Sequence, residues 1–377
     1  MIYFNNAATS FPKPDAVIKT YKDAAESLPS GQFRSASSMA DGDIFSLCKK
    51  RLGDLMGISA TDRIFFASGS TEGLNVILGG LGIRSGQIIT TVTEHNSVLR
   101  PLYNLPLIKG EPPVLLACDE NGYVPPELFE EEAKKGQAKA IVLNHCSNVT
   151  GAVQDAKAIG DIAVRYGLLY ILDVSQSAGC VEIRADEWGV DALAFTGHKS
   201  LMGLQGTGGY YVREGISLIP LKYGGTGLDS SRISYEDGRY EYEVGTQNSA
   251  GIAALSAALQ WIGDRGMDAI AKKERRLCGY LKDGLSGISG IRIFGKDISE
   301  GGPVVSFGMD GILPSDLAYI LQNSFDIVTR SGLHCAPLIH EHIGSGDKGT
   351  FRVSFSYLNE EAEIDELLSA LREISGD

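Results

Sequence analysis

The sequence lacks long apolar runs and a leader-like start. No window reaches the roughly 18 consecutive apolar residues that cross a bilayer. The first six residues show no basic stretch followed by an apolar run, so no signal peptide is visible. The six cysteines are scattered without a C-x-x-C pair, which disfavours a disulfide framework and a structural zinc site. We therefore expect a cytoplasmic protein with no membrane span and no bound metal.

Basic residues are also scarce. The chain has 34 Lys and Arg against 47 Asp and Glu, a net charge of −13. Such a balance repels phosphate groups, so neither nucleic acid nor an anionic membrane is an expected partner. The length of 377 residues exceeds that of an average domain, and two packed domains are the first expectation.

Short apolar runs alternate with amphipathic stretches in the first part of the chain. Strands are predicted at residues 63–66, 87–91, 114–117, 140–143, 168–174, 192–196 and 209–212, and helices at 71–78, 97–103, 126–135 and 155–166. This alternation predicts a mainly parallel sheet covered on both faces. Ligands of such sheets bind beyond the carboxyl ends of the strands.

The pattern changes after residue 249. Helices are predicted at 249–262, 272–285, 314–322 and 360–371, and strands at 291–294, 304–307 and 351–355. We predict an α/β fold with a large, mainly parallel-sheet domain over residues 15–250. A smaller α+β domain would combine residues 1–14 with residues 251–377.

Two strand ends carry charged residues. Lys199 ends Thr196-Gly197-His198-Lys199 and precedes a glycine-rich stretch. A lysine so placed can lose its proton, as a Schiff-base amine requires, although a solvated loop lysine is the alternative. Asp173 ends another apolar run. It either caps a helix or pairs with a buried cation such as a protonated ring nitrogen, and Gln176 could bond a phenolic oxygen of the same ring.

Two further strand ends complete the pattern. Ser70 and Thr71 stand where a predicted strand turns into a helix, an arrangement that favours a phosphate but is also common as plain capping. His95 follows another strand and could lie flat against an aromatic cofactor, or be an ordinary buried histidine. Because all four elements end strands of one predicted sheet, together they favour a pyridoxal 5'-phosphate (PLP) site.

The chain resembles, over essentially its whole length, the cysteine desulfurase and selenocysteine lyase branch of the class V aminotransferase superfamily. The matching pieces are Asn5-Asn6-Ala7-Ala8-Thr9, Gly69-Ser70-Thr71-Glu72, Glu94-His95-Asn96, Ser147-Asn148-Val149-Thr150-Gly151, Asp173-Val174-Ser175-Gln176, Gly197-His198-Lys199, Gly245-Thr246-Gln247-Asn248, Arg330-Ser331-Gly332-Leu333-His334-Cys335-Ala336 and Phe351-Arg352-Val353-Ser354. The resemblance implies that the large domain binds PLP.

The resemblance also assigns roles to single residues. It implies a Schiff base at Lys199, ring stacking by His95, and bonds from Asp173 and Gln176 to the ring. The implied phosphate ligands are Ser70, Thr71, Thr196 and His198, with Thr246 reaching the phosphate of a neighbouring subunit in a homodimer. Asn148, beside the cofactor, and Arg352 are the implied ligands of the carboxylate of an amino-acid substrate, a task that suits a guanidinium fork.

Cys335 distinguishes a lyase from an aminotransferase. It stands between Arg330 and a glycine-rich stretch, and neighbouring positive charge favours a thiolate. In the family, a cysteine in this context attacks the sulfur of the substrate, leaving a persulfide and alanine; an inert buried thiol is the alternative. Relatives carry a His- or Arg-containing loop near residues 30–38, where this chain has no histidine. Arg34 is the remaining candidate substrate ligand there.

The expected activity is PLP-dependent removal of sulfur or selenium from L-cysteine or selenocysteine. A sulfur-acceptor protein is a candidate partner. Two alternatives remain open, which are an aminotransferase or β-lyase acting on another amino acid, and an inactive cofactor-binding scaffold for a sulfur carrier.

Overall fold

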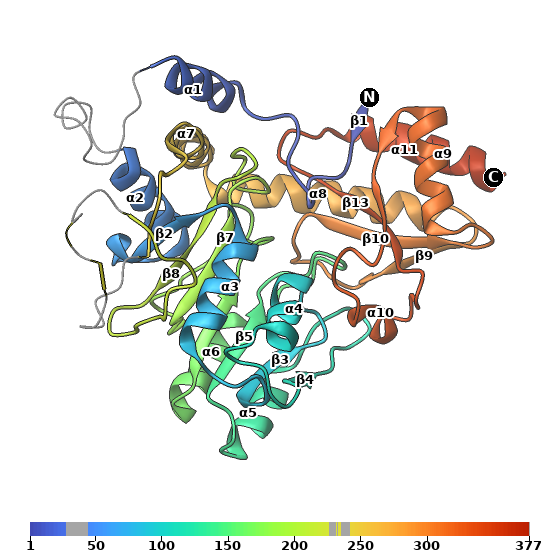
Figure 1. Cartoon of the computed structure of the whole chain (residues 1–377). Helices are drawn as coiled ribbons and strands as arrows, with labels where there is room; N and C mark the ends of the chain where they lie inside the picture. Colours follow the sequence, from blue (N-terminus) through green and yellow to red (C-terminus); the bar gives the residue numbers. More distant parts are fainter. Residues whose placement is uncertain (28–43, 226–230, 232, 235–241, 377) are drawn as a thin grey trace.

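A seven-stranded sheet forms the centre of the computed structural model, which describes residues 1–27, 44–225, 231, 233–234 and 242–376 (Figure 1). The strand order is β2-β8-β7-β6-β5-β3-β4. All neighbours from β7 to β4 are parallel, whereas β8 runs antiparallel to both β2 and β7. The predicted mainly parallel sheet is therefore confirmed. The strands are β2 (Ile64–Ala67), β3 (Ile88–Thr91), β4 (Val114–Leu116), β5 (Ala140–Asn144), β6 (Leu169–Asp173), β7 (Ala192–Thr196) and β8 (Gly208–Val212).

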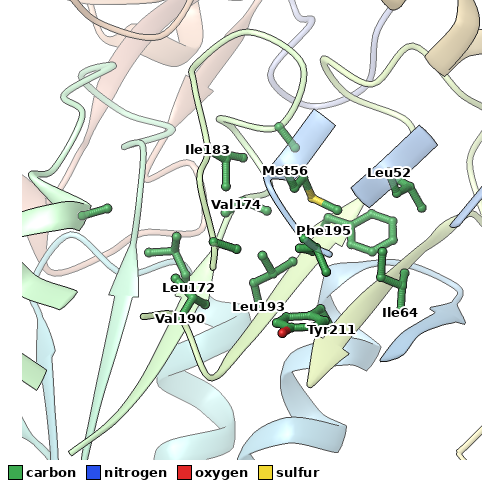
Figure 2. Close-up of a cluster of buried hydrophobic side chains, with 14 of the residues drawn as sticks. Leu52, Met56, Ile64, Leu172, Val174, Ile183, Val190, Leu193, Phe195 and Tyr211 are labelled. Atoms are coloured by element: carbon green, nitrogen blue, oxygen red, sulfur yellow. The ribbon is translucent and has the colours of Figure 1, made fainter. Parts of the chain in front are cut away.

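Helices cover both faces of this sheet, because side chains alternate between its faces and both sets are apolar. The helices are α1 (Asp15–Glu26), α2 (Ile44–Met56), α3 (Ser70–Leu81), α4 (Asn96–Asn104), α5 (Pro126–Lys134), α6 (Ala156–Tyr166) and α7 (Ser249–Arg265), with 3-10 turns at Thr61–Arg63 and Ser85–Gln87. On one face, Leu193 and Phe195 of β7 lie in the same buried cluster as Met56 of α2 (Figure 2). On the other face, Ala194 lies in a cluster with Leu74 of α3.

A second, antiparallel sheet lies in the C-terminal part, in the order β12-β13-β10-β9. Its elements and their companions are α8 (Met267–Leu285), β9 (Ile291–Phe294), β10 (Val304–Met309), α9 (Pro314–Phe325), β11 (Ile327–Val328), β12 (Arg330–Gly332), α10 (Ile339–His342), β13 (Thr350–Ser354) and α11 (Glu361–Ser375). The N-terminal strand β1 (Ile2–Tyr3) pairs with β11, so both chain ends lie in this part (Figure 1). The exact domain boundaries stay a prediction.

The sheet brings four of its strand ends together. Because β3, β5, β6 and β7 are parallel, their carboxyl ends share one edge. Asn144, the last residue of β5, lies opposite Asp173, the last residue of β6. Within the described ranges, no helix is both long enough and apolar enough to span a membrane. All six cysteines are free thiols.

Two helical glycines give a matched test of the packing around the sheet. A methyl group on Gly160 in α6 would overlap the backbone carbonyl of Trp188, whereas one on Gly263 in α7 would meet open space. Gly160→Ala should therefore lower the free energy of unfolding by about 1–3 kcal/mol through overpacking. Gly263→Ala should raise it by about 0.5–1 kcal/mol through helix propensity. Urea unfolding of both variants checks this, and shifts of the same sign would contradict the packing of α6.

Candidate active site

A cavity of about 290 Å³ opens at the shared edge of the strands. Nine predicted site residues line it: Ser70, Thr71, His95, Asn148, Asp173, Gln176, Thr196, His198 and Lys199. Arg330 also lines it, a residue to which the sequence had assigned only an influence on Cys335. Cys335, Arg352 and Thr246 do not. The strand ends therefore converge as expected, and three predicted residues lie outside the cavity that they form.

Asp173 is held rigidly at the end of β6. Its Oδ1 accepts hydrogen bonds from the backbone N–H of Ser175 at 2.9 Å, the Ser175 hydroxyl at 2.5 Å and the Ser70 hydroxyl at 3.3 Å. No described residue donates a hydrogen bond to Oδ2, although Asp173 lines the cavity. The carboxylate can therefore offer one oxygen to a cationic ring nitrogen. Gln176 also lines the cavity, and its Nε2 is anchored by donating to the Ala7 carbonyl at 3.0 Å.

Lys199 is enclosed by protein while part of its surface opens to the cavity. Burial lowers its pKa to about 8; Asp173 opposes this shift, and Arg352 and Arg330 add to it. An amine with this pKa exists in both protonation states near neutral pH. It can therefore act as a nucleophile in one state and deliver a proton in the other.

The peptide group before Lys199 is clamped by the N-terminal segment. The His198 carbonyl accepts from the Ser10 N–H at 2.8 Å, the Ser10 hydroxyl at 3.2 Å, the Thr9 hydroxyl at 3.2 Å and the Lys13 ammonium at 3.1 Å. Burial lowers the pKa of Lys13 to about 8. Four donors on one oxygen fix the backbone from which Lys199 extends. Sequence patterns did not predict this role for Ser10 or Lys13.

Both histidines of the cavity are neutral near pH 7. His95 caps α4 by accepting the Ser97 N–H on Nδ1 at 3.0 Å, which assigns the proton of the neutral ring to Nε2. Burial lowers its pKa to about 4, with Lys199 contributing. Burial and Lys199 likewise lower the pKa of His198 to about 4. A neutral ring at His95 suits stacking on an aromatic group.

Glu94 is a buried carboxyl group that the sequence reasoning missed. Its Oε1 accepts the Thr91 hydroxyl at 2.8 Å and the Asn144 N–H at 2.9 Å, which ties the ends of β3 and β5 together. Burial raises its pKa to about 8, and the nearby charge of Asp173 adds to the increase. Glu94 therefore carries its proton over most of the physiological range. Its place beside His95 in the sequence could not reveal this, because burial depends on the tertiary fold.

Arg352 and Asn148 meet at the base of the site. Arg352 is fully buried; its Nη1 donates to the Asn148 carbonyl at 2.9 Å and its Nη2 to Oδ1 of Asn5 at 3.1 Å. The Asn148 side chain donates to the His334 carbonyl at 2.6 Å. Nε of Arg352 and Oδ1 of Asn148 have no hydrogen-bond partner among the described residues. Buried polar atoms without partners are characteristic of a site that receives a ligand.

Three cations at or near the cavity lack an ion-pair partner among the described residues. Among the described residues, no carboxylate forms an ion pair with Lys199, Arg330 or Arg352. Burial and the neighbouring Arg330 lower the pKa of Arg352 below its usual range. The start of α3 adds backbone N–H groups, since no side chain caps the helix there. The cavity is therefore built to receive anions.

Cys335 lies in a tight turn beside the cavity. The Ala336 N–H donates to the Leu333 carbonyl at 2.9 Å, and the two central residues have positive φ angles, 49° at His334 and 60° at Cys335. Left-handed backbone costs roughly 1–2 kcal/mol for each such residue, so other contacts must hold the turn. Nη2 of Arg330 donates to the Cys335 sulfur at 3.4 Å, which places a cation where negative charge would develop.

Three backbone carbonyl groups of this turn accept hydrogen bonds from residues of other segments. Nε2 of His340 donates to the Leu333 carbonyl at 3.2 Å, while its Nδ1 contacts the Ser345 hydroxyl at 2.7 Å. The Asn96 N–H, at the start of α4, donates to the Cys335 carbonyl at 2.7 Å. The intervening carbonyl receives the Asn148 amide described above. These contacts fix Cys335 relative to both the cavity and α4.

Thr246 is a predicted site residue that lines a different cavity. Thr246 is exposed and lines an adjoining cavity of about 210 Å³, which shares Ser68 and Glu72 with the central one. Its contact with the phosphate of a neighbouring subunit stays a prediction. Arg34 lies outside the described residues.

The model of the aminotransferase class-V family matches residues 2–367. The chain belongs to this family. Its members depend on PLP, and the residues around the cavity fit that cofactor. Lys199 is a partly deprotonated amine, Asp173 offers a carboxylate oxygen, and the start of α3 offers N–H groups to a phosphate.

Individual relatives are cysteine desulfurases. A probable cysteine desulfurase of Methanothermobacter thermautotrophicus is 32% identical over 98% of this chain and 94% of that protein. One of Pyrococcus abyssi is 31% identical over 99% of this chain and 94% of that protein. The solved cysteine desulfurase of Thermococcus onnurineus has a TM-score of 0.91 at 29% identity, covering 100% of this chain and 94% of that one. The chain is thus a cysteine-desulfurase-like member of the family, and the expected fold and resemblance are confirmed.

The protonated state of Glu94 predicts a pH-dependent stability difference. Because burial raises its folded pKa to about 8 from an unfolded value of about 4.3, the folded state holds the proton more tightly. Glu94 therefore lowers stability progressively as the pH rises between these values. Glu94→Gln, which keeps the acceptor oxygen, should gain stability relative to the wild type from pH 5 to pH 8 in urea unfolding. Parallel stability curves would contradict a protonated Glu94.

His340 should control the reactivity of Cys335. His340→Phe removes the donor to the Leu333 carbonyl, whereas His340→Gln retains an amide that can donate there. We expect the alkylation rate of Cys335 by iodoacetamide to change at least about threefold in the Phe variant and less than about twofold in the Gln variant, as loss of one hydrogen bond implies. Peptide mass spectrometry over a pH series measures both rates. If the Phe variant loses stability but keeps the wild-type alkylation profile, His340 only supports the fold.

Proposed function

We propose that this protein is a PLP-dependent cysteine desulfurase that takes sulfur from L-cysteine and leaves alanine and a persulfide on Cys335. The observation that carries the proposal is the Arg330 guanidinium 3.4 Å from the Cys335 sulfur, in a turn next to an anion-receiving cavity that contains Lys199. An aminotransferase has no need of a thiol at this place. The cysteine desulfurases among the relatives support the same activity.

The residues of the cavity divide the work of holding the cofactor. PLP, when bound, supplies an electron sink for the α-carbon of the substrate. Asp173 would keep the ring nitrogen protonated, and Gln176 would face the phenolic oxygen. The start of α3, with Ser70 and Thr71, would receive the phosphate. Lys199 would hold the cofactor and carry the proton of the α-carbon, because its lowered pKa allows both protonation states.

The carboxylate of the substrate would be bound by two guanidinium groups, those of Arg352 and Arg330. Arg352 retains an Nε without a partner among the described residues, and Arg330 lines the cavity. The Asn148 amide would add a second hydrogen to this carboxylate while it holds the turn of Cys335. This arrangement would orient the sulfur of the substrate toward Cys335. Selenocysteine has the same carboxylate and amine and falls within the proposed substrate class.

Cys335 would accept the sulfur atom. Its thiolate attacks the sulfur of cysteine, the bond between that sulfur and the β-carbon breaks, and the electron pair passes to the carbon framework. Protonation of that framework gives alanine, and the sulfur remains on Cys335 as a persulfide. We also propose a homodimer in which Thr246 faces the phosphate of the second subunit; its exposed position is compatible with such a contact.

Cys335→Ala gives the decisive test. The variant should bind PLP with an unchanged absorbance spectrum but should lose at least about 100-fold of its alanine production from L-cysteine, because the thiol to which Arg330 donates is removed. Mass spectrometry after brief exposure to cysteine should find one added sulfur on Cys335 of the wild type.

Lys199→Ala is the matched control on the cofactor side. Borohydride should attach PLP to Lys199 in the wild type and leave this variant unmodified. If Cys335→Ala makes alanine at the wild-type rate, the persulfide mechanism is wrong. Consumption of a keto acid without loss of sulfur would identify an aminotransferase instead.

A further inference from the structure

A second hollow adjoins the cavity on its outer side. This hollow, the α4 groove, has a volume of about 390 Å³ and lies between α3 and α4; its lining includes Thr71, Asn75, His95, Arg100, Asn104 and Cys335. Its volume falls in the range of small-molecule sites, roughly 300–1,000 Å³. None of the proposed steps of desulfuration uses Asn75, Arg100 or Asn104.

Cys335 stands at the boundary between the two hollows. Thr71, His95 and Ser97 line both the cavity and the α4 groove, so these side chains form the wall that the hollows share. Cys335 lines only the groove, whereas Arg330, which donates to its sulfur, lines only the cavity. Sulfur that arrives from the cavity side can therefore leave on the groove side without passing the cofactor again.

The charge of the groove is opposite to that of the protein. The chain carries a net charge of −13, yet among the described residues the one permanently charged side chain that lines the groove is Arg100. Arg100 is exposed, and its guanidinium makes no ion pair or hydrogen bond with any described residue. His95 stays neutral because burial lowers its pKa to about 4.

The contrast between the negative chain and the positive groove favours a ligand that is small as well as negatively charged. A large acidic partner would meet the repulsion of the whole chain. A small anion inside the groove responds mainly to charges within about 8–10 Å, since salt screens the rest. Asn75 and Asn104 each use a side-chain N–H on a backbone carbonyl one turn earlier, and this leaves their amide groups in place to bond a polar ligand.

We propose that the α4 groove binds a small anionic thiol, one that bears a carboxylate or sulfonate group, and that this thiol takes the sulfur from Cys335. The proposal rests on the persulfide of the proposed function. The thiolate of the ligand attacks the outer sulfur of the persulfide, and the bond between the two sulfurs breaks. The electron pair stays on the Cys335 sulfur, beside Arg330, and the product persulfide takes the proton that the thiol lost. No oxidant or reductant is consumed.

The test uses a chemical analogue of the persulfide on the PLP-loaded protein. Methyl methanethiosulfonate caps Cys335 as a methyl disulfide, with Cys335→Ala reporting any labelling elsewhere. The cap is then removed by 2-mercaptoethanesulfonate, 2-mercaptoethanol or cysteamine, which are similar in size and carry negative, zero and positive charge. Mass spectrometry follows the loss of the cap at low ionic strength.

The measured quantity is the ratio of the rate with the anionic thiol to the rate with the cationic thiol. We expect Arg100→Glu to lower this ratio about tenfold or more and Arg100→Gln to give an intermediate value, as charges a few ångströms apart near a surface imply. Arg372→Glu, on the exposed end of α11, changes the net charge equally and should leave the ratio unchanged. High salt should reduce the effect of Arg100→Glu.

Two outcomes separate this proposal from the proposed function. If Arg100→Glu leaves the ratio at the wild-type value, the proposal is overturned, and the groove is left to a protein loop or to a second copy of the chain. Removal of the cap requires no desulfuration. A protein that forms no persulfide from cysteine but shows the Arg100 effect therefore counts against the proposed function alone.

Discussion

Positive charge that forms no ion pair with any described carboxylate is the constraint on which the site depends. Removing a cation from water costs several kcal/mol even after relaxation. The fold places Lys199 and Arg330 on the wall of the cavity and buries Arg352 near them, with no described ion-pair partner for any of the three. The surrounding groups adapt to this field. His95 stays neutral, and hydrogen bonds from Arg352 go to carbonyl and amide oxygens. A phosphate and a carboxylate would supply the missing negative charge, so binding of these ligands would also balance the charge of the site.

Cys335 is positioned in a different way. Cys335 owes its position to backbone strain, since two L-residues adopt left-handed φ angles in its turn, and neighbouring segments hold that strain. His340 contributes from α10, Asn96 from the start of α4 and Asn148 from the loop after β5. The Cys335 thiol is therefore aligned by segments from both the large-sheet part and the C-terminal part of the chain. Strain of this kind is typical of sites where a fixed orientation matters more than local stability.

The sequence predicted those helices and strands whose residue pattern is visible over a short stretch of chain. The β7 strand was predicted at residues 192–196 and observed there, because a short apolar run ends at a glycine-rich turn. Helix α1 was not predicted although its apolar residues recur at helical spacing, and Val17 is its only buried residue. Strands β1 and β11 have two residues each, too few for an alternating pattern.

The residues of the candidate site were predictable only in part. Residues at strand ends, such as Asp173 and Lys199, follow from the rule that parallel strands present their carboxyl ends together. The contact of Arg330 with the Cys335 sulfur depends on the turn that has His334 and Cys335 at its centre. Turns with two positive φ angles favour Asn-Gly, so the sequence His-Cys did not predict one here. Glu94 escaped notice because only the tertiary fold buries it.

The N-terminal segment links parts of the molecule that are far apart in the sequence. Residues 9–13 clamp the carbonyl before Lys199, β1 pairs with β11, and the Asn6 amide donates to the Ser354 carbonyl and to Oδ1 of Asn359. A chimera assembled from two family members would therefore have to take residues 1–13 and the segment from β11 to Asn359 from the same parent. Recombination that separates them would displace Lys199 while leaving every residue of the central sheet intact.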